Sequence, residues 1–200
     1  MLIEFIGLPG SGKTTYLQSK FEKNILTREE IKNRKIPMKT RFSFYFQEWK
    51  IVMLFVLGLL YNFEFKLKKW YALVLGVTAT LKQYSLVYHY IKKQPNRSII
   101  LDEGLLQRSL SICSYNDRKY NVQLLKILVK KINNLNIIDL VYSFEITIEE
   151  SKNRCKKRKS GLPFRFQNLN VSELNNKLNN FQKGILILKK YMKPELRIIK

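Results

Sequence analysis

The chain has 200 residues, 46% of them hydrophobic, which suits one domain with a sizeable core. The first apolar run begins at residue 2 and leaves no room for a leader peptide, so a cytoplasmic location is expected. Cys113 and Cys155 fit no metal-binding or redox spacing, which indicates two free thiols in a reducing compartment.

The formal net charge of +22 favours an anionic partner. The net charge alone is compatible with either nucleic acid or an anionic membrane as that partner. The basic residues are 27 lysines and 10 arginines, and lysine, asparagine and isoleucine together are typical of an AT-rich genome. Because the cations are scattered, apart from a cluster at Lys152–Lys159, we expect a polyphosphate ligand rather than a nucleic-acid surface.

The run Leu2–Ile6 predicts a buried strand, and the residues after it match G-x-x-x-x-G-K-[ST] in full. In this context the pattern predicts a phosphate-binding P-loop. Glycines allow successive N–H groups to point at a phosphate, and the helix that follows adds its positive N-terminal end. Lys13 can reach the β- and γ-phosphates, and the Thr14 hydroxyl can bind Mg²⁺. The predicted nucleotide-binding residues here are Gly7, Leu8, Pro9, Gly10, Ser11, Gly12, Lys13, Thr14 and Thr15.

A first helix is expected from Lys13 to about Glu22, then a short strand at Ile25–Leu26. Thr27 and Glu30 have capping-box spacing, which predicts a helix from Arg28 that ends before or at Pro37.

The stretch 41–93 holds two apolar segments, Ile51–Phe63 and Trp70–Leu81, which both predict helices. The first is shorter than the roughly 20 apolar residues of a membrane span and has charged neighbours. We expect a buried helical hairpin that packs on the sheet or lines an acceptor pocket. Membrane contact is the alternative.

The run from Ser98 to Asp102 predicts a strand that ends in two acids, Asp102 and Glu103. Such carboxylates can hold Mg²⁺ or accept a proton from an attacking hydroxyl, and Asp102 is the better metal ligand. Two alternatives stay open. Asp102 could only cap the helix that begins near Leu105, and Glu103 could orient a water, as in an ATPase.

The rest of the chain alternates helices and strands, which predicts a parallel sheet covered on both faces. In such a sheet Gly7 and Asp102 both follow carboxyl ends of strands, so they can meet at one site. The expected elements are a helix Leu105–Cys113, a helix along Val122–Ile132, a strand Ile137–Phe144, a helix capped by Thr147 and Glu150 that runs through Arg154, a helix capped by Ser172 with the stripe Leu174–Met192, and a strand Leu196–Ile199.

A basic segment follows the strand Ile137–Phe144, and Arg165 lies beyond a Gly161-Leu162-Pro163 loop. Mobile arginines over a γ-phosphate would stabilise transferred charge and exclude water, so we predict a lid at about 154–166. The alternative is a solvated helix end whose cations offset the macrodipole. The cations are Arg154, Lys156, Lys157, Arg158 and Lys159.

With these pieces in this order, the chain resembles the P-loop nucleoside and nucleotide kinases of the thymidylate and adenylate kinase type, and also uncharacterised kinase-like bacterial proteins. The match is specific at GLPGSGKTT, IILDEG and SKNRCKKRKSGLPFR. The resemblance implies an α/β, three-layer αβα P-loop NTPase fold with about five parallel strands in the order 2-3-1-4-5, and Mg-ATP as donor. It also implies that Arg154 and Arg158 lie on the ATP and lid side, with Arg165 as a third cation.

The acceptor half departs from the family. Where thymidylate kinases carry an Asp-Arg pair, this chain has Asp102-Glu103-Gly104, and Arg108 could replace the missing arginine. Thr27-Arg28-Glu29 resembles a substrate-binding tripeptide of thymidylate kinases, which makes Arg28 a candidate, and the apolar insert 41–93 stands where the family binds its acceptor. We expect one kinase-like domain over 1–200 that transfers the ATP γ-phosphate to a small hydroxyl- or phosphate-bearing acceptor. Lys13, Asp102, Glu103 and Arg158 are its catalytic candidates, and a P-loop ATPase or nucleotide switch, associated with nucleic acid or membrane, is the alternative.

Overall fold

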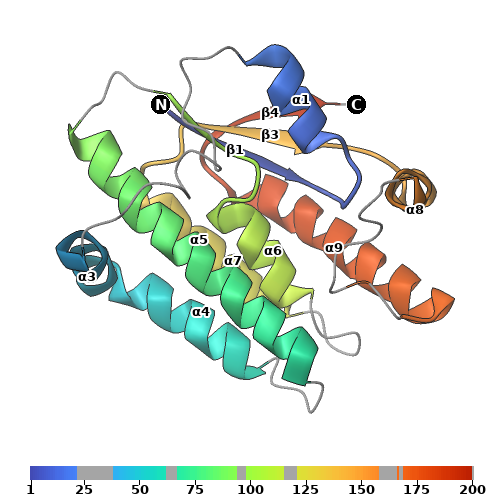
Figure 1. Cartoon of the computed structure of the whole chain (residues 1–200), viewed down its shortest axis with the longest axis horizontal. Coiled ribbons are helices and arrows are strands. Elements are labelled where there is room, and N and C mark those ends of the chain that lie inside the picture. The colour runs from blue at the N-terminus through green and yellow to red at the C-terminus, as the bar shows by residue number, and fades with distance from the viewer. Residues whose placement is uncertain are drawn as a thin grey trace.

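A computed structural model of the chain describes residues 1–21, 38–61, 67–93, 98–114, 121–157, 166 and 169–199 (Figure 1). Strands alternate with helices along it. The elements in chain order are β1 (Leu2–Gly7), α1 (Lys13–Lys20), α3 (Met38–Gln47), α4 (Trp49–Tyr61), α5 (Leu67–Lys93), β2 (Ile99–Leu101), α6 (Leu105–Cys113), α7 (Val122–Leu135), β3 (Leu140–Phe144), α8 (Ile148–Lys156), α9 (Val171–Tyr191) and β4 (Glu195–Ile199).

The described strands form one parallel sheet in the order β2-β1-β3-β4. This is the 3-1-4-5 part of the expected order, with four strands where about five were expected. The remaining expected strand, at Ile25–Leu26, lies outside the described residues, as does the helix expected from Arg28. Glu4 pairs with Leu101, so the carboxyl end of β2 lies beside the middle of β1.

Each face of the sheet carries its own hydrophobic cluster. On one face, α1 lays Tyr16 and Leu17 against Phe5, Tyr142 and Phe144 of β1 and β3. On the other face, α6, α7 and α9 close the main core, with Leu2, Ile6 and Val141 at the sheet. The result is the expected helix–sheet–helix layering, seen in Figure 1 with α1 above the strands and α6, α7 and α9 below.

Helices α3, α4 and α5 form an outer layer that packs on α6 and α7. The prediction that these helices pack on the sheet was wrong, since they pack on α6 and α7. The alternative, that they line an acceptor pocket, stays a prediction. A Cβ on Gly58 of α4 would lie 2.5 Å from Ile112 of α6, which shows how closely these helices approach. The insert also contains α3, which the sequence did not predict, and α5 runs for 27 residues. Among the described helices, none is both long and apolar enough to cross a bilayer.

The capping residues of α8 and α9 can be compared with the predictions made from the sequence. Thr147 caps α8 as predicted, since its side chain accepts the Glu150 N–H at 3.1 Å, but the Glu150 side chain pairs with Arg154 rather than completing the predicted capping box. The prediction of Ser172 as the cap of α9 was wrong. Asn170 caps that helix through a reciprocal capping box, in which Asn170 Oδ1 accepts the Glu173 N–H and Glu173 Oε2 accepts the Asn170 N–H.

Candidate active site

The loop between β1 and α1 turns sharply at two glycines. Gly10 and Gly12 have φ angles of 79° and 87°, in the left-handed region where side chains are strained. Gly12 precedes the first residue of α1, and among the described residues no side chain caps this helix. The first N–H groups of α1 are therefore oriented toward the space over the loop, which suits an anion.

Lys13 reaches back across the loop from the first turn of α1. Its ammonium donates to the carbonyl oxygens of Gly7 and Leu8, both at 3.0 Å, and to Ser11 Oγ at 3.1 Å. Thr14 and Thr15 are exposed on the same turn. The cation thus lies over the concave side of the loop, where phosphate oxygens would replace these acceptors.

Helix α8 supports the loop from outside. Ser151 Oγ donates to the Pro9 carbonyl at 2.6 Å, and a Cβ on Gly10 would lie 3.0 Å from the Ser151 carbonyl oxygen and 3.1 Å from Cys155 Sγ. Any larger residue at position 10 would meet both strain and contact. Cys155 and Cys113 are both buried, and neither forms a disulfide within the described part of the chain.

Arg154, near the end of α8, lies beside the same loop. A Cβ on Gly12 would be 3.8 Å from Arg154 Nη1, and the guanidinium pairs with Glu150 one turn earlier. About half of the Arg154 side chain is exposed. The arginine is therefore held near the loop by a surface pair that a stronger anion could displace.

A buried carboxyl group joins β1 to α6. Glu4 lies in the middle of β1 and is fully buried, and its two oxygens accept the N–H groups of Leu105 and Leu106 at 3.0 Å each. A Cβ on Gly104 would lie 2.1 Å from Glu4 Cδ, so only glycine permits this approach. Burial raises the pKa of Glu4 to about 8, although the N–H groups of Leu106 and Leu105 act to lower it.

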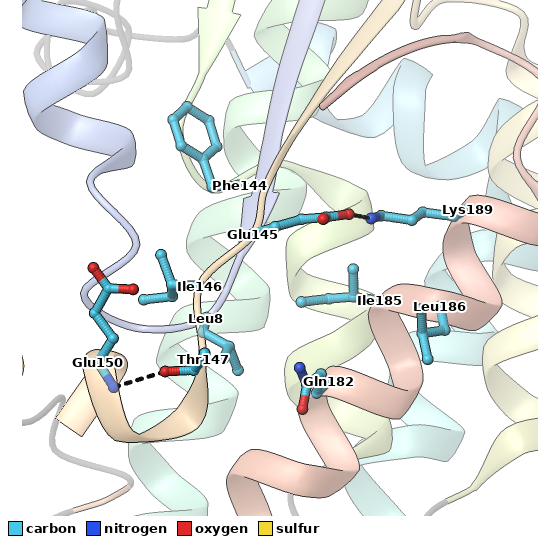
Figure 2. A pocket seen from close by; sticks show the side chains of 10 residues that line it. All are labelled: Leu8, Phe144, Glu145, Ile146, Thr147, Glu150, Gln182, Ile185, Leu186 and Lys189. Atoms are coloured by element: carbon cyan, nitrogen blue, oxygen red, sulfur yellow. Dashed lines mark hydrogen bonds and ion pairs between the residues drawn. The ribbon is translucent and has the colours of Figure 1, made fainter. Parts of the chain in front are cut away.

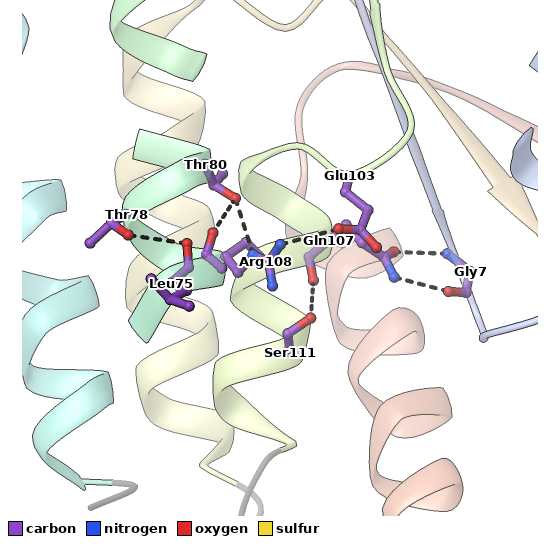
Figure 3. A network of polar contacts seen from close by, with 9 residues as sticks. Gly7, Leu75, Thr78, Thr80, Glu103, Gln107, Arg108 and Ser111 are labelled. Atoms are coloured by element: carbon purple, nitrogen blue, oxygen red, sulfur yellow. Dashed lines mark hydrogen bonds and ion pairs between the residues drawn. The ribbon is translucent and has the colours of Figure 1, made fainter. Parts of the chain in front are cut away.

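A second contact joins the same helix to the loop itself. The side-chain amide of Gln107, on α6, bonds to both backbone polar groups of Gly7. Its Oε1 accepts the Gly7 N–H and its Nε2 donates to the Gly7 carbonyl, each at 3.1 Å (Figure 3). Gln107 is buried. Together with Glu4, it fixes the start of α6 against the last half of β1.

Asp102 and Glu103, in the turn between β2 and α6, therefore lie beside the second half of β1, since β2 ends at Leu101 opposite Glu4. Asp102 does not act as the cap of α6, because Glu4 accepts the first N–H groups of that helix. Glu103 Oε2 instead pairs with Arg108 at 3.1 Å, and Arg108 Nε donates to Thr80 Oγ1 of α5 at 3.1 Å (Figure 3).

The Arg108 guanidinium is closely surrounded. It lies against Gly76 of α5, where a Cβ would be 2.5 Å from Nη1, and its side chain is only 12% exposed. Glu103 is 42% exposed. The Glu103 end of this ion pair therefore faces solvent near the end of β2, while the Arg108 end is fixed between α5 and α6.

A cavity of about 530 Å³ opens beside the loop, between the β3–α8 connection and α9 (Figure 2). Leu8 contributes to it from the loop, and an ion pair between Glu145 and Lys189 crosses one side. The residues that line the cavity are Leu8, Phe144, Glu145, Ile146, Thr147, Glu150, Gln182, Ile185, Leu186 and Lys189.

The structure brings the loop, Arg154 and the acidic turn to one edge of the sheet. The assigned roles of these residues stay predictions. Three further predicted site residues, Arg28, Arg158 and Arg165, lie outside the described residues, as does most of the expected lid.

The sequence did not reveal three residues that support this site: Glu4, Gln107 and Ser151. Glu4 had a signal, since it is an acid inside an otherwise apolar strand. Gln107 and Ser151 had none, because a polar residue on a helix gives no indication of a partner about a hundred positions away.

No family model matches the chain, and no curated protein matches it. Solved structures do. Deoxyadenosine kinase from M. mycoides with bound dATP matches over 100% of this chain and 90% of its own, with a TM-score of 0.51 and 17% identity. The structure of that enzyme with the products dCMP and dCDP covers the same shares, with a TM-score of 0.49 and 14% identity.

The dATP-bound structure shows that this chain has the P-loop NTPase fold. The expected fold class is thereby confirmed, and so is the resemblance to P-loop nucleoside kinases at the level of fold. Fold alone does not assign a reaction, which depends on the residues at the site.

Proposed function

We propose that the chain is an ATP-dependent phosphotransferase that acts on a small acceptor. The observation that carries this proposal is the double attachment of α6 to β1. Through Glu4 and Gln107, the acidic turn Asp102–Glu103 is set against the strand that leads into the phosphate-binding loop. A donor loop and a carboxylate pair at one sheet edge are what phosphoryl transfer to an acceptor requires.

The loop fits the phosphates of ATP on three grounds. Gly10 and Gly12 take the backbone angles that turn N–H groups inward, α1 begins at the loop, and Lys13 lies over it. In the proposed complex Lys13 holds the β- and γ-phosphates. Arg154, with Arg158 and Arg165 of the predicted lid, stabilises the charge that spreads over the γ-phosphate oxygens.

Thr14 and Asp102 would hold Mg²⁺. Within the described part of the chain, no three acidic, histidine or cysteine side chains gather into a metal site. One hydroxyl and one carboxylate suit Mg²⁺, which takes its other ligands from phosphates and water. When bound, the ion neutralises charge on the phosphate oxygens.

The proposed reaction forms a bond from an acceptor oxygen to the γ-phosphorus and breaks the bond to the β–γ bridging oxygen. ADP leaves with that electron pair. If the acceptor is an alcohol, its proton passes to a carboxylate oxygen of Asp102 or Glu103. Arg108 positions Glu103 for this step, because it fixes that side chain at 3.1 Å.

Nucleosides are the first acceptor class to test, because one of the matching solved structures is that of a deoxyadenosine kinase. Arg108 and Arg28 are the candidate contacts on the acceptor side. Arg108 is anchored by Thr80 and Glu103, which suits a fixed contact surface better than a mobile one.

The test is an acceptor screen with Mg-ATP that measures ADP release, over deoxynucleosides, ribonucleosides, nucleoside monophosphates, sugars and polyprenols. One acceptor class should raise ADP release well above the rate without acceptor, and the phosphorylated product should be detected by mass. Lys13→Ala should lower turnover by about 100-fold or more. Lys20→Ala, an exposed lysine at the other end of α1, serves as the matched control and should leave it unchanged.

Acceptor-independent hydrolysis that no acceptor stimulates would contradict the transferase and support the ATPase alternative. If RNA or DNA stimulated that hydrolysis, with binding that weakens steeply with salt, the nucleic-acid alternative would hold instead.

A further inference from the structure

The outer side of α3 and α4 carries a row of large apolar side chains on the surface. Within each helix they recur every three or four residues, the spacing that keeps side chains on one face of that helix. The opposite side of α4 is buried against the protein through Ile51, Phe55 and Leu59. The exposed row is Phe42, Phe46, Trp49, Met53, Val56, Leu57 and Leu60, and α5 adds Tyr71 and Leu75.

The exposure of this row is high for side chains of this size. Phe46 is 84% exposed, Phe42 65%, Leu60 61% and Trp49 56%. A contiguous apolar patch on a protein surface indicates a contact that excludes water. Figure 1 shows α4 along the edge of the molecule that lies far from the sheet.

The charge around the patch favours an anionic partner. Lys39 and Lys50 are exposed on α3 and α4, and Lys82 on α5. Residues 38–93 contain nine lysines and arginines against two glutamates, in a chain with a net charge of +22. Two copies of this face would bring like charges together, which disfavours a second copy as the occupant.

We propose that this face, residues 42–60 with Tyr71 and Leu75, docks on the surface of an anionic lipid bilayer. Aromatic and aliphatic side chains would enter the interface while the lysines contact anionic headgroups. Helix α4 has 13 residues, about 20 Å of helix, which is shorter than a bilayer core of about 30 Å. The helix therefore lies along the interface. This inference is independent of the proposed phosphotransfer.

The test is cosedimentation of the whole chain with large vesicles of 30% phosphatidylserine in phosphatidylcholine, without nucleotide. The wild type should pellet with these vesicles and bind pure phosphatidylcholine at least tenfold more weakly. Phe46→Glu with Trp49→Glu should lower the partition coefficient at least tenfold. Ile127→Glu with Val171→Glu is the matched control, since it adds the same charges at exposed apolar positions on α7 and α9.

A second measurement does not depend on a charged variant folding. In Trp70→Phe, Trp49 is the remaining tryptophan, and its emission should shift to the blue and resist aqueous quenchers when anionic vesicles are added. Three results would overturn the proposal. They are a wild type that stays in the supernatant, control variants that lose binding as much as the test pair, or a dimer in solution that the test pair dissociates.

Discussion

Gln107 gives the sharpest test of how this site is built. Its amide satisfies both polar groups of the Gly7 peptide, at 3.1 Å each, from a helix a hundred residues away in the chain. We predict that Gln107→Met, which keeps the length of the side chain but not its hydrogen bonds, destabilises the fold and weakens ATP binding together.

The magnitude follows from the two contacts. The buried Gly7 N–H loses its acceptor, which costs about 1–3 kcal/mol. The Gly7 carbonyl also accepts a hydrogen bond from Lys13, so the loss of its bond from Gln107 costs less, about 0.5–1.5 kcal/mol. The free energy of unfolding should fall by about 1.5–4.5 kcal/mol, and the Kd for ATP should rise about tenfold as the loop loses its anchor.

The variant Gln107→Glu keeps the shape of the side chain and changes only its hydrogen-bonding groups. One glutamate oxygen can still accept the Gly7 N–H, while the other faces the Gly7 carbonyl and must carry a proton to bond with it. This environment raises the pKa of the new carboxyl group, so the stability it contributes is complete below its ordinary pKa and is lost as pH rises through the raised value.

Urea unfolding between pH 4 and 8 and titration with a fluorescent ATP analogue measure these effects. Ser109→Ala is the control, because Ser109 lies on the same helix and donates only to Leu105 of its own turn. If Gln107→Met and Gln107→Glu unfold alike at every pH, or if ATP affinity does not change, the amide does not anchor the loop.

The remaining predictions concern the same supports. Because burial raises the pKa of Glu4 from its usual 4.5 to about 8, the folded state keeps a proton that the unfolded state releases, and stability should fall as pH rises from about 4.5 to 8. Urea unfolding of Glu4→Gln should show a flatter pH dependence; an equal slope would refute the assignment. Gly104→Ala, whose Cβ would lie 2.1 Å from Glu4 Cδ, should lower the free energy of unfolding by about 3 kcal/mol or more, and a wild-type melting temperature would refute the close contact. Ser151→Ala removes the bond to the Pro9 carbonyl and should cost about 1 kcal/mol and raise the Kd for ATP a few-fold by calorimetry, whereas an unchanged Kd would show that α8 does not support the loop.

Much of the architecture could be predicted because its signals are local. Helix α6 has the predicted bounds, Leu105–Cys113, and β4 begins one residue before the predicted Leu196. The cap of α9 was wrong by two residues, since Asn170 and Ser172 are both good capping residues and only the backbone decides between them. The insert was predicted as helical and apolar, but its spacing cannot tell which apolar face is buried when nearly every position is apolar.

Eight consecutive residues were enough to predict the tight loop between β1 and α1, because the glycines, the lysine and the start of the helix all lie within them. The contacts that support this loop from behind depend on the tertiary structure. Glu4 meets Leu105, and Gln107 meets Gly7, only because β1 and β2 are parallel neighbours and α6 returns along them. The tertiary structure also decided that one side of α4 stays on the surface, since α6 and α7 cover only the other. Such contacts depend on which distant surfaces pack together, and no local pattern encodes that choice.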